Sequence, residues 1–152
     1  MKIFLVVVSF LLWSSESFSQ AEEEREKVLS VVQDFFVALE TQDTVLFQSL
    51  FIDYAFNHYV REFQDSTKTW VETGTQNPDG FTFKPNRILT ERLTGQDLEV
   101  KIHKRIAMVW SPYNFWVNEE FSHCGIDVFT MFKTDAGWKI SSVSFSVEPS
   151  FD

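Results

Sequence analysis

The sequence predicts an α+β domain in which N-terminal helices pack on a curved, mostly antiparallel β-sheet. Residues 22–41 carry apolar side chains at spacings of three and four, which is the period of an amphipathic helix. Residues 106–140 are rich in aromatic and β-branched side chains, which is typical of long strands. Because the helical pattern comes first and the strands follow as successive hairpins, an α+β arrangement is favoured over an alternating α/β one.

Residues 1–19 are expected to be a signal peptide that is not part of the domain. Lys2 supplies a short positive region, and residues 3–13 form an apolar run that is too short to span a bilayer. Ser17 and Ser19 are small residues that suit a cleavage after Ser19. We therefore expect an exported chain, periplasmic or secreted, whose single domain covers residues 20–152 and keeps no membrane anchor after cleavage.

Charge and cysteine content exclude several classes of protein. The formal net charge is −9, so the chain repels phosphate backbones and nucleic acid is not an expected partner. Cys124 is the only cysteine of the sequence, so the fold must depend on packing without an internal disulfide. The sequence contains no phosphate-binding glycine loop, no CxxC pair and no HExxH motif. We expect neither a cofactor nor a metal site.

The individual elements follow from the pattern in order along the chain. A helix over residues 22–41 is followed by Asp43, a good N-cap for a second short helix. Pro112 is expected to bend or bulge its strand before the strand continues to Val117. Gly137 suits the short hairpin loop before the last strand. The expected strands cover residues 54–63, 86–93, 98–110, 121–134 and 138–147, and residues 64–80 are expected to be a polar loop.

Four short segments resemble the NTF2-like superfamily, in particular its small bacterial members. They are Val109-Trp110-Ser111-Pro112-Tyr113, Ser122-His123-Cys124-Gly125, Asp127-Val128-Phe129 and Gly137-Trp138-Lys139-Ile140. The superfamily includes SnoaL-like, lumazine-binding-like and ketosteroid-isomerase-like proteins. The resemblance implies a cone-shaped α+β barrel around a cavity, and frequent homodimers. It implies no single activity, because the superfamily contains enzymes as well as plain binding proteins.

His123 and Asp127 are the expected catalytic residues if the cavity carries chemistry. They lie four apart on a strand, so they project from the same face, about 13 Å apart along it. His123 can act as an acid or base near neutral pH, and Asp127 can act as a base if burial raises its pKa. The alternative is structural, with His123 bonded to a neighbouring strand and Asp127 exposed or paired. Cys124 points to the opposite face and is expected to be a small buried thiol.

Aromatic residues near the expected bend are candidates for ligand binding. The ligand-binding residues that we expect are Trp110, Tyr113, Phe115, Trp116 and His58. The aromatic side chains can equally pack against the helix or a partner subunit.

Three functions are open at this point. The preferred one is binding of a small, partly apolar molecule in the cavity of a protein that forms a homodimer through the outer sheet face. The second is a SnoaL-like or ketosteroid-isomerase-like enzyme that uses Asp127 or His123 as general acid or base. The third is a protein-interaction module whose cavity is filled by side chains.

Overall fold

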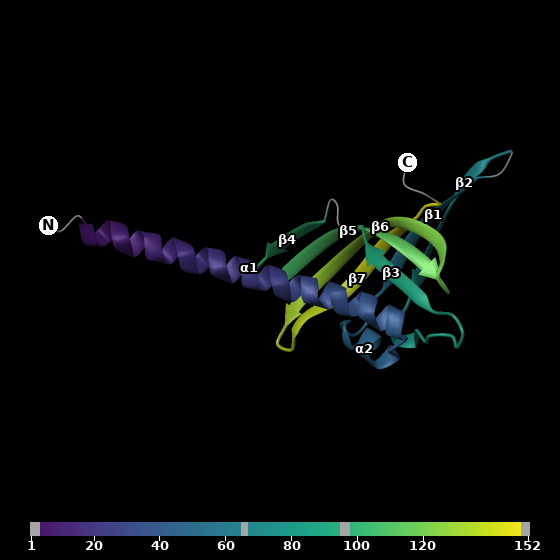
Figure 1. Ribbon diagram of the computed structural model, residues 1–152, viewed down its shortest axis with the longest axis horizontal. Helices are drawn as coiled ribbons and strands as arrows, with labels where there is room; N and C mark the ends of the chain where they lie inside the picture. The colour runs from purple at the N-terminus through teal and green to yellow at the C-terminus, as the bar shows by residue number, and fades with distance from the viewer. Residues whose placement is uncertain (1–3, 65–66, 95–97, 150–152) are drawn as a thin grey trace.

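A computed structural model of the chain describes residues 4–64, 67–94 and 98–149. A long helix lies across one face of a seven-stranded sheet, and a short second helix follows it (Figure 1). The helical elements are α1 (Phe4–Thr41), α2 (Thr44–Ser49) and the 3-10 turn η1 (Pro78–Gly80). The strands are β1 (Asn57–Gln64), β2 (Thr69–Gln76), β3 (Leu89–Leu93), β4 (Glu99–His103), β5 (Ile106–Val117), β6 (Glu120–Thr134) and β7 (Gly137–Val147).

The sheet has the strand order β2-β1-β7-β6-β5-β3, and β4 also pairs with β5. Among the described strands, β1 and β7 run parallel, and the other pairs are antiparallel. The long strands β5, β6 and β7 curve together across the helix side of the sheet (Figure 1). The structure thus confirms the expected α+β class, with N-terminal helices on a curved, mostly antiparallel sheet. We call the face that packs on α1 the inner face and the opposite one the outer face.

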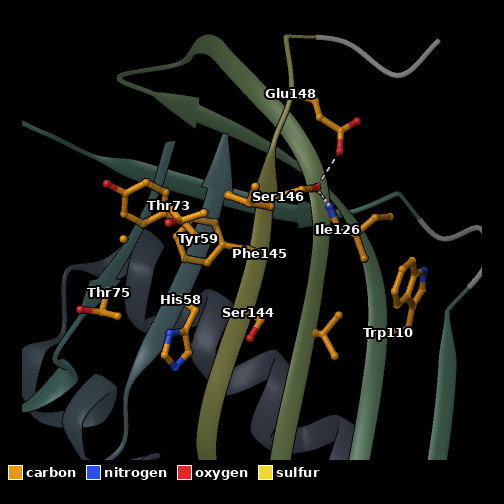
Figure 2. A pocket seen from close by; sticks show the side chains of 13 residues that line it. His58, Tyr59, Thr73, Thr75, Trp110, Ile126, Ser144, Phe145, Ser146 and Glu148 are labelled. Atoms are coloured by element: carbon orange, nitrogen blue, oxygen red, sulfur yellow. Dashed lines mark hydrogen bonds between the residues drawn. The ribbon is translucent and has the colours of Figure 1, made fainter. Parts of the chain in front are cut away.

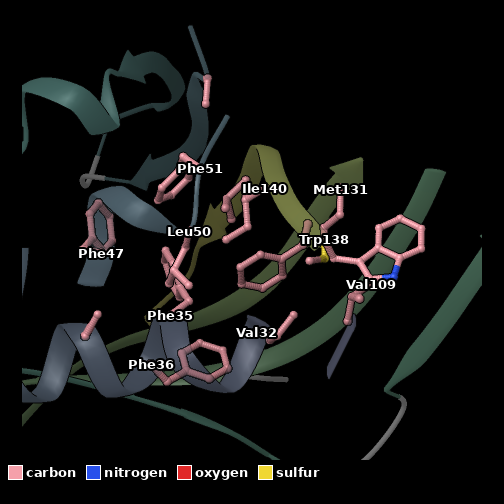
Figure 3. Close-up of a cluster of buried hydrophobic side chains, with 14 of the residues drawn as sticks. Val32, Phe35, Phe36, Phe47, Leu50, Phe51, Val109, Met131, Trp138 and Ile140 are labelled. Carbon is pink, nitrogen blue, oxygen red and sulfur yellow. The ribbon is translucent and has the colours of Figure 1, made fainter. Parts of the chain in front are cut away.

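Aromatic side chains hold the helices on the inner face (Figure 3). The Phe35 ring of α1 lies 5.2 Å from the Phe129 ring of β6 and 5.4 Å from the Phe47 ring of α2, centroid to centroid. Burial of each such ring stabilises the fold by about 1.5–3 kcal/mol. Asp43 caps α2 as expected, because its carboxylate accepts the Leu46 N–H at 2.9 Å. This cap fixes the turn that places Phe47 beside Phe35.

Helix α1 begins at Phe4 and not near Glu22, where the periodic pattern starts. The side chains of residues 1–19 lie outside those described, so the export signal stays a prediction. None of the described helices combines the length and the apolar character that crossing a membrane requires.

The prediction of a polar loop over residues 64–80 is wrong for most of that segment. Residues Thr69–Gln76 form β2, which pairs with β1 along its whole length. Nearly all side chains of β2 are exposed, so the apolar–polar alternation of a half-buried strand is missing. Backbone pairing and the stacked rings of Phe63 and Trp70, 5.3 Å apart, hold this edge hairpin together.

The expected continuous strand over residues 98–117 is in fact two strands. A tight turn separates β4 from β5, with His103 opposite Ile106 and Lys104 at a φ of 54°. Lysine rarely adopts positive φ, and no glycine or proline marks this turn in the sequence. The turn therefore forms because the two strands pair, and not because of a local turn signal.

Pro112 does not interrupt the pairing of β5 with β6, where a bulge or bend was expected. The irregularity in the pairing of β5 with β6 lies further on, between Phe115 and Trp116. The Pro112 carbonyl accepts the Thr94 N–H at 3.0 Å, on the side where β3 ends and β4 has not yet begun. The N–H that proline lacks would point to this same gap, so no ladder hydrogen bond is lost.

Candidate functional site

A cavity of about 230 Å³ lies between the inner face and the helices. Phe35 and Leu39 of α1 and Phe47 of α2 form its helical wall. Side chains of β1, β3, β5, β6 and β7 form most of the remainder, joined by Gln76 at the end of β2 and by Phe81 and Arg87 of the segment before β3. Pockets for drug-sized ligands measure about 300–1,000 Å³, so this cavity suits a smaller molecule. Its wall combines apolar side chains with several polar and charged ones, and the polar and charged groups define what the site can do.

Asp127 is the buried acid of β6, and it lines the cavity together with His123. The two share the inner face, as their spacing predicts. Asp127 is only 3% exposed and lies opposite Ser111 of β5. Within the described ranges, neither the Asp127 Oδ2 nor the Ser111 Oγ has a hydrogen-bond partner. A buried carboxylate oxygen that lacks a partner is costly, and such groups gather at functional sites.

Glu91 of β3 is a second buried carboxyl group, and it forms a hydrogen bond with Asp127. Burial raises the pKa of Asp127 to about 7, and the hydrogen bond with Glu91 limits that rise. Burial, followed by the charge of Asp127, raises the pKa of Glu91 well above its usual range. Because the charge of Asp127 contributes to the raised Glu91 pKa, Asp127 ionises first, and Glu91 then keeps its proton and donates its hydrogen bond to Asp127.

Tyr113 lines the same cavity, but its hydroxyl already donates a hydrogen bond within the protein. The hydroxyl donates to the Ser146 carbonyl at 2.6 Å, and burial raises the Tyr113 pKa well above its usual range. The Ser146 Oγ in turn accepts the Ile126 N–H at 3.0 Å (Figure 2). A Cβ at position 125 would overlap this carbonyl, so Gly125 permits the close approach that its mid-strand position predicts. Tyr113 thus anchors β7 and offers a ligand only hydroxyl lone pairs.

His123 is held as a neutral imidazole at the cavity wall. Burial, followed by the positive charge of Arg61, lowers the His123 pKa to about 4. The ring stacks on Phe115 with centroids 4.7 Å apart, and its Nδ1 lies 3.0 Å from the Ser122 Oγ. The expectation that His123 titrates near neutral pH is therefore corrected. A base this weak is a poor proton acceptor compared with Asp127.

The structure separates the expected ligand-binding residues into two groups. Tyr113 and Phe115 line the cavity, whereas His58, Trp110 and Trp116 do not. His58 and Trp110 lie on the outer face, along a separate groove of about 770 Å³ (Figure 2). They therefore lie away from the cavity in which they were expected to bind a ligand. The reason is strand alternation, since each residue of β5 that packs in the core turns its neighbours outward.

Trp116 lies beyond the irregularity in β5 and also misses the cavity. Its ring lies under the Arg92 guanidinium at 5.7 Å and meets the Phe121 ring at 6.0 Å. Cys124 is buried on the side away from the cavity, as expected for a small core thiol.

Three charged residues of the cavity were not predicted, namely Arg61, Arg87 and Glu91. Glu91 lies two residues from both Leu89 and Leu93, so the three side chains share one face of the strand. A single charged residue on an otherwise apolar strand face is a signal that could have identified it. Arg61 lines the cavity from β1, and only the pairing of β1 with β7 places it there. In the part of the chain that the structure describes, no three His, Cys, Asp or Glu side chains are grouped to hold a metal ion.

No protein-family model matches the sequence, and no curated protein matches it either. Among solved structures, an NTF2-like superfamily protein from Salmonella enterica is similar with a TM-score of 0.64 and 12% identity, over 87% of this chain and 96% of that chain. The protein has the NTF2-like fold. An NTF2-like protein with a cystatin-like fold from Novosphingobium aromaticivorans is similar with a TM-score of 0.61 and 14% identity, over 87% and 86% of the two chains.

A candidate dehydratase of the NTF2-like family from Streptomyces avermitilis is also similar, with a TM-score of 0.60 and 16% identity, over 87% of this chain and 99% of that chain. Identities this low establish the NTF2-like fold alone. The SnoaL-like subtype stays a prediction. In this NTF2-like fold, function has to be argued from the cavity and its side chains.

Proposed function

We propose that the protein binds a small, partly apolar carbonyl compound in the inner cavity and catalyses proton transfer at the carbon beside the carbonyl. Asp127 is the general base in this proposal. One observation carries it, the buried pair of Asp127 and Glu91 at the wall of the inner cavity, with one Asp127 oxygen unpaired among the described residues. The activity belongs to the ketosteroid-isomerase-like class, which covers isomerisations and eliminations.

The pKa of Asp127 suits this role. A general base works best when its pKa lies near the operating pH, and burial brings the Asp127 pKa to about 7. Glu91 stays protonated at that pH, so it holds the Asp127 carboxylate by a hydrogen bond without competing for the substrate proton. Asp127 takes the C–H proton, and the electron pair passes to the carbonyl oxygen of the substrate. The same carboxyl group can return the proton to a different carbon.

Plain ligand binding is the main alternative, and it explains the cavity but not the acid pair. Two desolvated carboxyl groups lower the stability of a fold, so a binding protein gains nothing from them unless its ligand pairs with them. The filled-cavity interaction module is less well supported, because about 230 Å³ between helix and sheet is not occupied by side chains.

A general-base probe tests the proposal without knowledge of the natural substrate. In the ring opening of nitrobenzisoxazole, a base removes the C–H proton, the N–O bond breaks and a coloured cyano-nitrophenolate forms. We expect the protein to accelerate this reaction with a rate that rises with pH and is half-maximal near the Asp127 pKa of about 7. Asp127→Asn should lower kcat/KM by about 100-fold or more.

Asp135→Asn is the matched control, since it removes an exposed carboxylate from the hairpin between β6 and β7 and should leave the rate unchanged. Equal rates for wild type and Asp127→Asn would refute the assignment of the base. Tight binding of small carbonyl compounds with no proton transfer would favour the plain binding protein instead.

A further inference from the structure

Two arginines, Arg61 of β1 and Arg87 of the segment before β3, line the same cavity as the acid pair. The sequence has 22 acidic and 13 basic residues, so basic side chains have many possible partners. Within residues 4–64, 67–94 and 98–149, the ion pairs involve other basic side chains, and none includes Arg61 or Arg87. Two cations that avoid ion pairs beside one cavity indicate an anionic ligand.

Arg61 is the better placed of the two. Its parallel pairing with Val147 turns it to the inner face, and its Nε is buried with no hydrogen-bond partner among the described residues. The guanidinium lies 5.5 Å from the centroid of the Phe63 ring, which restricts its orientation. Its positive charge, after burial, contributes to the lowered pKa of His123. The arginine is therefore half-buried, oriented and without a counterion in the region that the structure describes.

The sheet register places Arg61 at a useful separation from Asp127. Arg61 lies opposite Val147 and Asp127 lies opposite Phe145, two residues along β7 or about 7 Å. Arg61 belongs to β1 and Asp127 to β6, the two strands on either side of β7. The backbones of these two strands are therefore also about 10 Å apart across the sheet. Both side chains line one cavity of about 230 Å³. A small molecule can therefore contact the guanidinium at one end and the carboxylate at the other.

We propose that the substrate is a small oxo acid whose carboxylate binds Arg61, with Arg87 as a second cation. The C–H group beside the ketone of this acid then lies at Asp127. That second placement rests on the proposed function, whereas the anion site at Arg61 does not. The guanidinium matches a carboxylate with two parallel hydrogen bonds, and the net charge of −9 disfavours anions elsewhere on the molecule.

The proton transfer balances without a further reactant. Asp127 accepts the proton, the C–H electron pair forms a C=C bond and the ketone oxygen becomes the enolate oxygen. Return of the proton to carbon restores the ketone, so nothing is oxidised or reduced. The substrate carboxylate keeps its charge throughout and serves only to hold the molecule at Arg61.

Benzoylpropionate and its uncharged amide, benzoylpropionamide, are matched probes for calorimetric binding to the full protein. We expect wild type to bind the acid at least about tenfold more tightly than the amide. Arg61→Gln should reduce this ratio to about one while amide binding is retained, which also shows that the cavity remains folded. Arg87→Gln should reduce the ratio less. Arg105→Gln, which alters an exposed arginine paired with Asp135, should leave it unchanged.

A ratio near one in wild type, an unchanged ratio in Arg61→Gln, or no binding of either probe would each overturn the anion site. Deuterium uptake from D2O beside the probe ketone separates this result from the fate of the proposed function. If the protein prefers the acid and this preference requires Arg61, but deuterium exchange does not require Asp127, the anion site is retained and the role of Asp127 as base is refuted. If deuterium exchange requires Asp127 but is equally fast for the acid and the amide, the role of Asp127 as base is retained and the anion site is refuted.

Discussion

Two carboxyl side chains, Asp127 and Glu91, are removed from water on the inner face of the sheet. Burial raises both pKa values, so ionisation of either group opposes folding. The pair therefore lowers the stability of the fold, a cost that is common at active sites and that agrees with the proposed function.

Replacement of Asp127 should reveal this cost. Folding raises the Asp127 pKa from 3.8 to about 7, so the folded state holds an extra proton between these values and its stability falls as the pH rises through that window. We expect Asp127→Asn to be more stable than wild type above pH 7, by on the order of 1–4 kcal/mol, and the gain to vanish toward pH 4. Urea unfolding across this range measures it. A variant less stable than wild type at every pH would contradict the burial argument.

Gly125 is required by a backbone contact and not by a turn. Any Cβ there meets the Ser146 carbonyl, which cannot move without losing its hydrogen bond from Tyr113. We expect Gly125→Ala to lower the free energy of unfolding by about 1–3 kcal/mol, as overpacking does. Gly80→Ala is the control, because nothing lies within 4 Å of the Cβ it would add. Equal unfolding midpoints for the two variants would show that the contact is unimportant.

At the scale of elements, Glu24 ties α1 to the sheet. Its Oε2 accepts a hydrogen bond from Lys133 Nζ of β6 at 2.6 Å and one from Trp138 Nε1 of β7 at 3.1 Å. Hydrogen bonds from Lys133 and then Lys27 lower the Glu24 pKa to about 2. The glutamate therefore acts as an inter-element anchor in the middle of α1, whereas the sequence places it near a helix start.

Glu24→Ala should loosen α1 on the sheet. We expect a loss of about 1 kcal/mol from the two inter-element hydrogen bonds, together with a change in Trp138 fluorescence. Glu23→Ala, which removes only a contact with Lys27 within the helix, should change neither. Because the Glu24 pKa is lowered in the fold, the difference between wild type and Glu24→Ala should be complete above pH 4.5 and disappear as the pH falls toward 2. A difference that persists at the acid end would rule out the charge as its source.

The elements also show what local pattern can and cannot predict. The α2 cap at Asp43 and the β6–β7 hairpin at Gly137 were predictable, because each depends on chemistry within a few residues. The exposed strand β2 and the turn at Lys104 were missed, because pairing with a distant or newly formed strand stabilises them and no local preference does.

At the scale of the molecule, the outer face leaves apolar side chains in water. Val60, Ile106, Trp110 and Phe132 are each at least 40% exposed. Trp110 also lines the outer groove (Figure 2). Exposed apolar patches of this kind mark interaction surfaces. We propose that two copies pair through this face, as the family resemblance implies.

Trp110→Glu should convert this dimer to a monomer, because it places two charges in an apolar interface. Light scattering coupled to size exclusion measures the mass directly. Trp70→Glu is the control, since Trp70 is similarly exposed, at 40%, but belongs to the edge hairpin. A monomeric wild type, or a Trp110→Glu variant that remains dimeric, would rule out this interface.

The sequence by itself determined the fold class, the order of helices before strands and the shared face of His123 and Asp127. These depend on periodicity, and periodicity states which residues of one strand point the same way. It does not state which face the helix covers, so it could not show that Trp110 and His58 lie along the outer groove, away from the inner cavity.

Only the tertiary structure decided the chemistry of the cavity. Strand pairing brings Glu91 of β3 to Asp127 of β6, and it brings Arg61 of β1 toward His123. A pKa depends on solvent exclusion and on neighbouring charges, and both come from residues far apart in the chain. For this reason we propose Asp127 and not His123 as the base, a distinction that no local pattern contains.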